Sequence, residues 1–194
     1  MRKHTLGPQG LINPKPVLLI GTIVDGVPNF MTAALGTLID REPPMVGVSI
    51  RPGHHTYKGI RQNGAFSVNI PSTKMLYETD FCGIVTGKKE DKVNRCDFKL
   101  FYGKNKIAPM IQQCPVNLEC TVKHEIVFKG HVFIIGKIEE TYVSESCLTG
   151  GKFDETKIDL MVYISGITGG YRAYHELGPM LAKSHSIGKN LKKK

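Results

Sequence analysis

Apolar residues recur along the first half of the chain in short runs bounded by Pro and Gly. Residues 17–24, 45–50 and 65–70 are rich in β-branched side chains, which favour strands. The Asp-Gly dipeptide at 25–26 is typical of a tight hairpin, so we expect a return strand to begin near Pro28. The pattern predicts antiparallel strands.

Helical signals are short and few. Residues 55–62 precede an Asn-Gly pair at 63–64, which is typical of a helix C-terminus. A Ser-Thr pair at 72–73 can cap a second short helix that ends at Tyr77. Residues 87–94 are charged and predict an exposed helix or turn. We expect the last two segments to contribute little to the core.

The second half of the chain returns to strand patterns. Residues 115–123, 125–129 and 130–142 alternate β-branched and polar side chains, with a Lys-Gly turn at 129–130. Many strands, few helices and regular turn signals predict a mainly β protein. Such a pattern favours a closed or nearly closed antiparallel barrel over a doubly wound sheet.

The length and composition of the chain are those of a single domain. The 194 residues, 41% of them hydrophobic, predict a single domain over residues 1–194, with a core of about 10–175 and a basic tail at 183–194. The chain has no apolar run near the roughly 20 residues of a membrane helix and no signal-peptide pattern at its start. Its five cysteines are odd in number and lack a Cys-x-x-Cys motif. We therefore expect reduced thiols, a cytoplasmic location and no membrane partner.

The net charge of +9 requires no polyanionic partner. Four of the lysines close the chain at 189–194, a run without a helix pattern that we expect to be solvated and dispensable for ligand binding. Residues 88–92 mix signs like an ordinary helix surface. Because basic residues are not interleaved with aromatics, nucleic acid is not expected, and anionic small molecules or acidic redox partners fit better.

Two polar segments outline a candidate ligand site. Residues 29–34 are polar and rich in small residues, which suits close backbone approach to a flat ligand. Residues 51–58 combine a strand ending in Arg51, a Gly-containing turn and a helix start. An arginine fork beside a helix N-terminus makes an anion site. The implied ligand is a flat ring joined to a phosphate. The adjacent His54 and His55 lack the spacing of a zinc site, so no metal is expected.

Several motifs in one order carry a resemblance to a known family. They are Asn29-Phe30-Met31-Thr32-Ala33-Ala34, Pro43-Pro44-Met45-Val46-Gly47-Val48-Ser49-Ile50, His55-Thr56-Tyr57, Gly64-Ala65-Phe66-Ser67-Val68-Asn69-Ile70-Pro71, Thr79-Asp80-Phe81-Cys82-Gly83, Cys114-Pro115-Val116-Asn117-Leu118-Glu119-Cys120 and Gly130-His131. The series, which covers roughly residues 10–145, resembles the flavin reductase-like, flavoredoxin-type family. The resemblance implies an FMN-binding split β-barrel, an antiparallel Greek-key barrel with a few short helices. It also implies a homodimer that holds FMN near the subunit interface.

Residue chemistry and the resemblance together assign roles. Asn29 and Thr32 would hydrogen-bond the polar edge of the flavin, and Arg51 would supply the principal charge for the phosphate. The candidate cofactor-binding residues are Asn29, Phe30, Met31, Thr32, Ala33, Ala34, Ser49, Ile50, Arg51, His55, Thr56, Lys58 and Cys82. Leu35 stands where the family commonly has an aromatic residue, often Trp, so the residue that stacks on the ring is left open.

Each assignment has a plainer alternative. Asn29 is also a good turn residue after Pro28, and Arg51 is also a typical surface side chain at a strand end. Cys82 contacts the flavin or takes part in redox exchange in one interpretation, and is a buried thiol in the other. His131 resembles a family position near the nicotinamide, but a half-buried strand histidine is equally ordinary. Cys82 and His131 are the weak catalytic candidates.

Two function classes remain open. The first is an oxidoreductase, an NAD(P)H-dependent flavin reductase in which the protein orients the donor and excludes water. The second is a flavoredoxin-type FMN electron-transfer protein that takes electrons from a redox protein partner. A relative of pyridoxamine phosphate oxidase fits the motifs less well. The electron donor and acceptor are not specified by the sequence.

Overall fold

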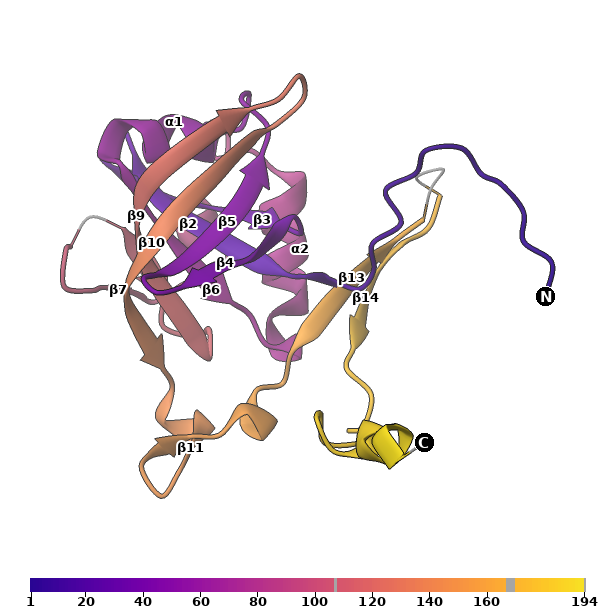
Figure 1. Ribbon diagram of the computed structural model, residues 1–194. Helices are drawn as coiled ribbons and strands as arrows, with labels where there is room; N and C mark the ends of the chain where they lie inside the picture. Colours follow the sequence, from indigo (N-terminus) through magenta and orange to yellow (C-terminus); the bar gives the residue numbers. More distant parts are fainter. Residues whose placement is uncertain (107, 167–169, 194) are drawn as a thin grey trace.

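The computed structural model describes residues 1–106, 108–166 and 170–193 and is dominated by antiparallel strands (Figure 1). The strands are β1 (Lys15–Pro16), β2 (Leu18–Val24), β3 (Val27–Ala33), β4 (Gly36–Arg41), β5 (Pro44–Ile50), β6 (Ala65–Ile70), β7 (Leu100–Tyr102), β8 (Pro109–Ile111), β9 (Val116–Val127), β10 (Val132–Val143), β11 (Leu148–Thr149), β12 (Lys152–Phe153), β13 (Met161–Ser165) and β14 (Arg172–Glu176). The α-helices are α1 (His55–Asn63), α2 (Leu76–Ile84) and α3 (Lys92–Arg95), and the 3₁₀ helices are η1 (Thr73–Met75), η2 (Glu145–Cys147), η3 (Glu155–Lys157) and η4 (Ile187–Lys193).

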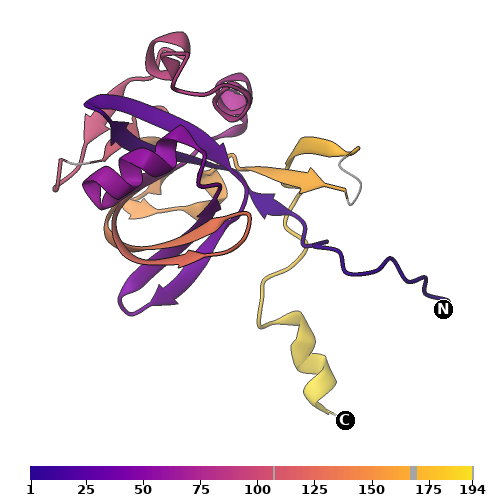
Figure 2. The same ribbon diagram turned by 90° about the horizontal axis from the view of Figure 1, so that it is seen from above.

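Seven of these strands form one antiparallel sheet in the order β3-β2-β6-β9-β10-β5-β4. Seen from above, the sheet curls around an enclosed interior (Figure 2). The β2–β3 hairpin turns at Asp25 and Gly26, whose φ values of 49° and 83° are those of a tight primed turn. Asn29 lies within β3 opposite Thr22, which excludes its alternative role as a turn residue.

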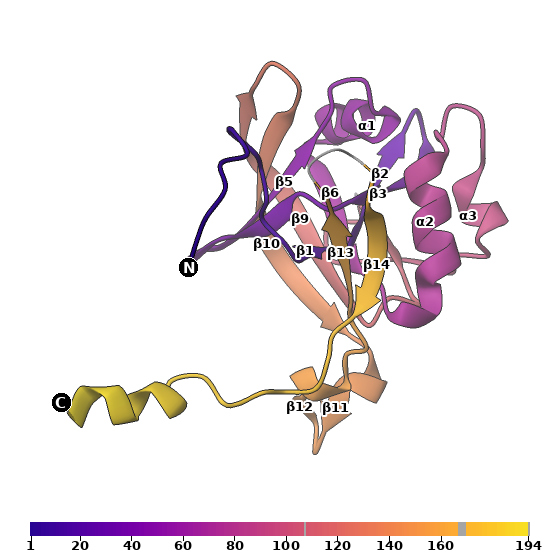
Figure 3. The same cartoon turned by 90° about the vertical axis from the view of Figure 1, so that its right-hand side faces the viewer.

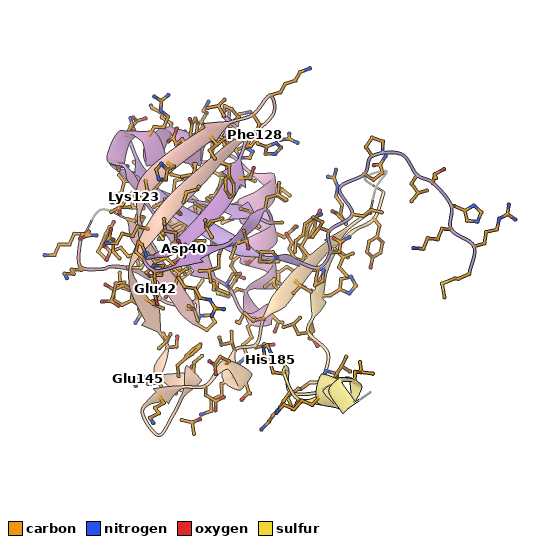
Figure 4. All side chains as sticks on the ribbon, in the orientation of Figure 1. Asp40, Glu42, Lys123, Phe128, Glu145 and His185 are labelled. Atoms are coloured by element: carbon orange, nitrogen blue, oxygen red, sulfur yellow. The ribbon has the colours of Figure 1, made fainter. Side chains whose placement is uncertain are left out.

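The long strands β9 and β10 correct one boundary of the sequence prediction. Residues 116–127 form a single strand paired with β10, whereas a break had been expected at His124. The predicted turn at 129–130 is confirmed, and Phe128 marks this hairpin tip in Figure 4. The pairing of β9 with β10 shifts register here, because Ile135 pairs with His124 whereas Gly136 pairs with Val122. The shift interrupts the alternation of side chains along β9, which is why the sequence pattern predicts two strands instead of one.

Two apolar clusters follow from the two-residue period of β2 and β3. Ile20 and Met31 face the barrel interior with Val48 and Phe66, while Leu19 and Phe30 face outward. The outer cluster is covered by the segment from η1 to β7, and it includes Met75, Cys82, Phe98, Ile111 and Cys114. The prediction that residues 72–77 contribute little to the core was therefore wrong, because Met75 is buried in this cluster, whereas residues 87–94 contribute only the partly buried Val93 to it. The predicted second helix is also longer, because α2 continues through the motif at 79–83 to Ile84.

Outside the seven-stranded barrel sheet, β1, β13 and β14 form a separate three-stranded sheet in the order β1-β13-β14, which we call the arm. In Figure 3 the arm strands lie beside α2, and the C-terminal segment extends away from the barrel. The sequence predicts no helix in the basic tail, but residues 187–193 form a 3₁₀ helix. Within the described residues, no helix has the length and apolar character needed to cross a membrane.

Candidate functional site

Three adjoining cavities form a groove between β3 and the segment from α2 to α3. The first, of about 480 Å³, lies at the start of β3 opposite residues 87–91. The middle cavity, of about 210 Å³, lies between residues 29–32, the start of α1 and residues 82–87. The third, of about 340 Å³, lies between the end of β3, α2 and the arm, and we call it the arm cavity. Neighbouring cavities share lining residues, so the groove is continuous along β3.

The first turn of α1 forms one wall of the middle cavity. Asn29 Nδ2 donates a hydrogen bond of 2.8 Å to Thr56 Oγ1, which ties β3 to this helix end. Gly87 closes over the pair: a Cβ at this position would lie 1.9 Å from Asn29 Oδ1, so only glycine fits. His55 Nδ1 is buried without a hydrogen-bond partner among the described residues. This end of the cavity therefore offers free polar groups to a ligand.

Lys92 supplies a buried cation to the same cavity. Its side chain is at the start of α3, which Asp91 caps by accepting a hydrogen bond from the backbone N–H of Asn94. Lys92 is 4% exposed, and its Nζ donates to the carbonyls of Phe30 and Cys82 at 2.8 and 2.9 Å. An ammonium has a third donor, for which the described residues provide no acceptor. Burial lowers the pKa of Lys92, and an anion in the cavity would oppose that shift.

The electrostatics of the middle cavity favour an anion. None of the described residues that line it is acidic, and it is bordered by Lys92, His54 and His55. Burial, then Arg51, lowers the pKa of His54, and burial, then Lys88, lowers the pKa of His55. A negatively charged ligand would relieve this repulsion between like charges.

The cysteines near the groove are protonated at neutral pH. Burial raises the pKa of Cys82 to about 12, and it also raises the pKa of Cys96. A buried thiol with a raised pKa is a poor nucleophile. Cys82 packs in the outer core cluster and lines the middle cavity at the same time. This placement suits contact with a ligand better than thiol chemistry.

The structure brings together some of the predicted residues and separates others. Those that line the groove are Asn29, Met31, Thr32, Ala34, His55, Thr56 and Cys82. The Phe30 ring is buried against Phe98 and only its carbonyl reaches Lys92, and Ala33 and Ile50 are buried in the barrel core. Ser49 is a half-buried strand residue whose backbone N–H donates to Leu35 O. The side chains of four predicted cofactor-binding residues therefore do not line the groove, namely Phe30, Ala33, Ser49 and Ile50.

The basic residues that the sequence predicts for the site lie outside the middle cavity, with the exception of His55. Arg51 is exposed and does not line the middle cavity, although it is close enough to lower the pKa of His54. Lys58 is absent from the lining of the three cavities and forms an ion pair of 2.5 Å with Asp25. His131 lies at the β9–β10 turn, outside the lining of the three cavities.

Sequence reasoning missed the residues that only folding brings to the groove. In the middle cavity these are Gly83, Val85, Thr86, Gly87 and Lys92, and in the arm cavity they are Val17, Asp80, Ile84, Tyr163, Arg172 and Tyr174. Gly53 and His54 also line the middle cavity, and both lie in the predicted segment 51–58. One signal for Lys92 was present: Asp91 is a good N-cap residue, which places Lys92 in the first helical turn. Nothing in the sequence marked the side chain as buried.

Comparison with known proteins defines the class. The family model described as "Flavin reductase like domain" matches residues 11–165, so the chain belongs to this family. The family and the split-barrel fold predicted from the sequence are thereby confirmed.

Two solved structures extend the similarity along nearly the whole chain. A flavoredoxin from Methanosarcina acetivorans is 37% identical with a TM-score of 0.90, and the alignment covers 98% of this chain and 100% of that one. The flavoredoxin of Desulfovibrio vulgaris (Miyazaki F) is 34% identical with a TM-score of 0.86, covering 96% and 100%. An uncharacterized protein of Archaeoglobus fulgidus is 33% identical over 118 residues, which are 60% of this chain and 67% of the relative.

Proposed function

We propose that this protein binds FMN in the groove along β3 and uses it to transfer electrons. One observation carries the proposal: residues from β3, the start of α1, the end of α2 and the start of α3 line one cavity, and none of its described lining residues is a carboxylate. Helix starts and buried cations bind phosphates. Membership of the flavin reductase-like family supports a flavin as the ligand.

The groups at the middle cavity fit the phosphate end of FMN. The nine-residue helix α1 has no side-chain cap, and the backbone N–H groups of His55 and Thr56 have no hydrogen-bond partner among the described residues. Lys92 Nζ and His55 Nδ1 both have unused hydrogen-bonding capacity toward the described residues around them. These groups would hold the phosphate, and Gly87 lets the backbone approach it closely.

The rest of the groove would hold the ribityl chain and the ring. Bound FMN would supply hydride and single-electron transfer, which no amino-acid side chain provides. The chain's own residues bind, orient and shield it: Thr32 Oγ1 is fixed by donating to Thr79 O, and α2 covers one side. With Arg51 and Lys58 outside the cavity, we place the phosphate at Lys92 and α1 instead of at Arg51.

We propose electron transfer of the flavoredoxin type as the physiological role. The supporting observation is the similarity to two flavoredoxins over 96% or more of this chain. The donor would then be a redox protein. NAD(P)H-dependent flavin reduction is the second candidate, and the family description favours it.

The spectrum of the purified protein tests both levels of this proposal. We expect a yellow protein that binds FMN more tightly than riboflavin, because the phosphate contacts are charge-assisted and contribute about 1.5–3 kcal/mol each. Equal affinities would exclude the phosphate site. NADH or NADPH added without air should leave a flavoredoxin-type protein oxidised for minutes, and bleaching within seconds would instead identify a reductase.

Three further features belong to the proposal. We infer that residues 1–194 act as one domain, which the pairing of β1 with β13 supports because it joins the N-terminal and C-terminal parts of the chain.

We infer a homodimer, for which the exposed apolar residues Leu38 and Ile39 on the sheet-edge strand β4 provide a surface. We also infer a cytoplasmic location, with which the five free cysteines agree.

A further inference from the structure

Two cysteines lie side by side between the groove and a fourth cavity. Cys82 on α2 lines the middle cavity. Cys96, the C-cap residue of α3, lines a cavity of about 620 Å³ between α2 and the end of α3, which we call the outer cavity. The two side chains are hydrogen-bonded, and Cys96 packs against the apolar cluster that contains Cys82. Figure 3 shows the two helices as neighbours. The pair therefore has one cysteine at each cavity.

The two thiols of this pair are not equivalent. Burial raises the pKa of Cys82 to about 12, and its side chain is buried in the cluster. Burial also raises the pKa of the half-buried Cys96, but a hydrogen bond from Cys82 and the positive charges of Lys92 and Arg95 oppose this increase. The more accessible thiol with the better stabilised thiolate attacks first in disulfide exchange. Cys96 is therefore the attacking thiol and Cys82 the resolving one.

The outer cavity has a chemistry of its own. Beside Cys96 it is lined by three carboxylates, one guanidinium and three apolar or aromatic side chains, namely Glu78, Asp80, Asp97, Arg95, Tyr77, Phe81 and Ile84. Glu78 Oε2 is buried without a hydrogen-bond donor among the described residues. The volume of about 620 Å³ lies within the roughly 300–1,000 Å³ of small-molecule sites. The cavity therefore suits a small cationic ligand with an apolar middle.

We propose that Cys96 and Cys82 form a redox-active dithiol that reduces small cationic disulfides bound in the outer cavity. The Cys96 thiolate attacks one sulfur of the bound disulfide, which forms a mixed disulfide and releases the first thiolate. Cys82 then attacks the Cys96 sulfur, which forms a disulfide between the two cysteines and releases the second thiolate. The two protons that the cysteines lose complete the two product thiols. Both electrons come from the dithiol, so the reaction goes beyond the proposed function and does not depend on FMN.

The local structure permits the bond between the two sulfurs. A disulfide requires them to approach more closely than a hydrogen bond does. Cys96 ends a helix of only four residues, and its neighbours Arg95 and Asp97 are exposed, so a small shift of this turn displaces little of the core. The bond would join α2 to α3, which carries Lys92 at the middle cavity.

Thiol counting and peptide mapping of the full chain test the dithiol. Cystamine, a disulfide with two ammonium groups, should remove two of the five free thiols of the reduced protein and link the peptides of Cys82 and Cys96. Cys82→Ser should stop at the mixed disulfide on Cys96, and Cys96→Ser should lose no thiol. Cys147→Ala is the matched control: Cys147 is buried outside both cavities, so this variant should form the link as the wild type does.

A second measurement tests the charge of the ligand. Oxidised glutathione is a disulfide with a net negative charge, and each rate is divided by the rate of the same disulfide with mercaptoethanol. The normalised rate with cystamine should be at least about tenfold higher, because a cleft lined by carboxylates concentrates cations. Glu78→Gln should reduce this ratio. Wild-type protein that forms no link, or a link to any other cysteine, would overturn the dithiol, and equal normalised rates would overturn the cationic ligand.

Discussion

At the scale of single residues, the chemistry of the groove depends on a lysine with an unusual environment. Lys92 is buried and hydrogen-bonded to two carbonyls, and no carboxylate lines its cavity among the described residues. Burying a charge without a counter-charge is costly, so such a group commonly indicates a ligand of opposite sign. Arg51, the cation that the sequence favours, is exposed instead.

Substituting the two cations separately locates the phosphate. Lys92→Met should lower FMN affinity by about thirtyfold, equivalent to about 2 kcal/mol, and leave riboflavin affinity unchanged. Arg51→Met should change either affinity by less than about fivefold, because an exposed charge contributes about 0–1 kcal/mol. Fluorescence titration measures both, and thermal unfolding confirms that each variant is folded. A large loss in Arg51→Met with none in Lys92→Met would move the phosphate to the end of β5.

At the scale of elements, the site depends on how closely residues 85–88 approach the start of α1. Gly87 permits this approach, because its missing Cβ leaves room for the Asn29 side chain. Asn29 in turn joins β3 to Thr56 of α1. Three elements therefore meet at one glycine, and adding a single methyl group should separate them.

Two glycines of the same cavity provide a matched pair of variants. Gly87→Ala should lower the free energy of unfolding by about 1–3 kcal/mol, because displacing Asn29 breaks a buried hydrogen bond, and it should also weaken FMN binding. At Gly53 an added Cβ meets no atom within 4 Å, so Gly53→Ala should leave stability and binding close to wild type. Denaturant unfolding and flavin titration give both quantities. Equal behaviour of the two variants would show that the close approach is not required.

At the scale of the whole molecule, the barrel and arm form the site and the C-terminal tail lies apart. The described residues that line the three cavities end at Tyr174. Met180, Leu181 and Ile187 are exposed in the segment that extends away from the barrel in Figure 1. Among the described residues, the basic end of the chain therefore does not line the groove.

A truncated chain of residues 1–182 tests the separation. We expect it to bind FMN as tightly as the full chain and to remain a homodimer, because neither the groove nor the edge strand β4 involves the tail. Flavin titration measures the first property. Light scattering measures the second, with an expected mass about twice that of the truncated chain, as for the full chain of 21.5 kDa. Loss of flavin binding, or a monomer with full affinity, would contradict this view of the molecule.

Local patterns alone determined much of the fold. The β2–β3 hairpin, strands β5 and β6, and helix α1 with its end at Gly64 were predictable because their signals lie within a few residues. The hairpin follows from Asp25-Gly26, and the end of α1 from the left-handed conformation of Gly64, whose φ is 60°. The family resemblance was equally local, since it rests on motifs read in order.

Tertiary structure alone decided the rest of the site. The mixed signs around Lys92 look like a surface in sequence, and only the packing of α3 on β3 buries that side chain. Tyr174 and Arg172 reach the groove because β14 pairs with β13 and contacts α2, more than 90 residues away in the chain. Arg51 shows the opposite outcome, because its strand ends beside the cavity with the side chain outside. Periodicity fixes which face of an element is apolar, but burial and contact depend on which distant element covers that face.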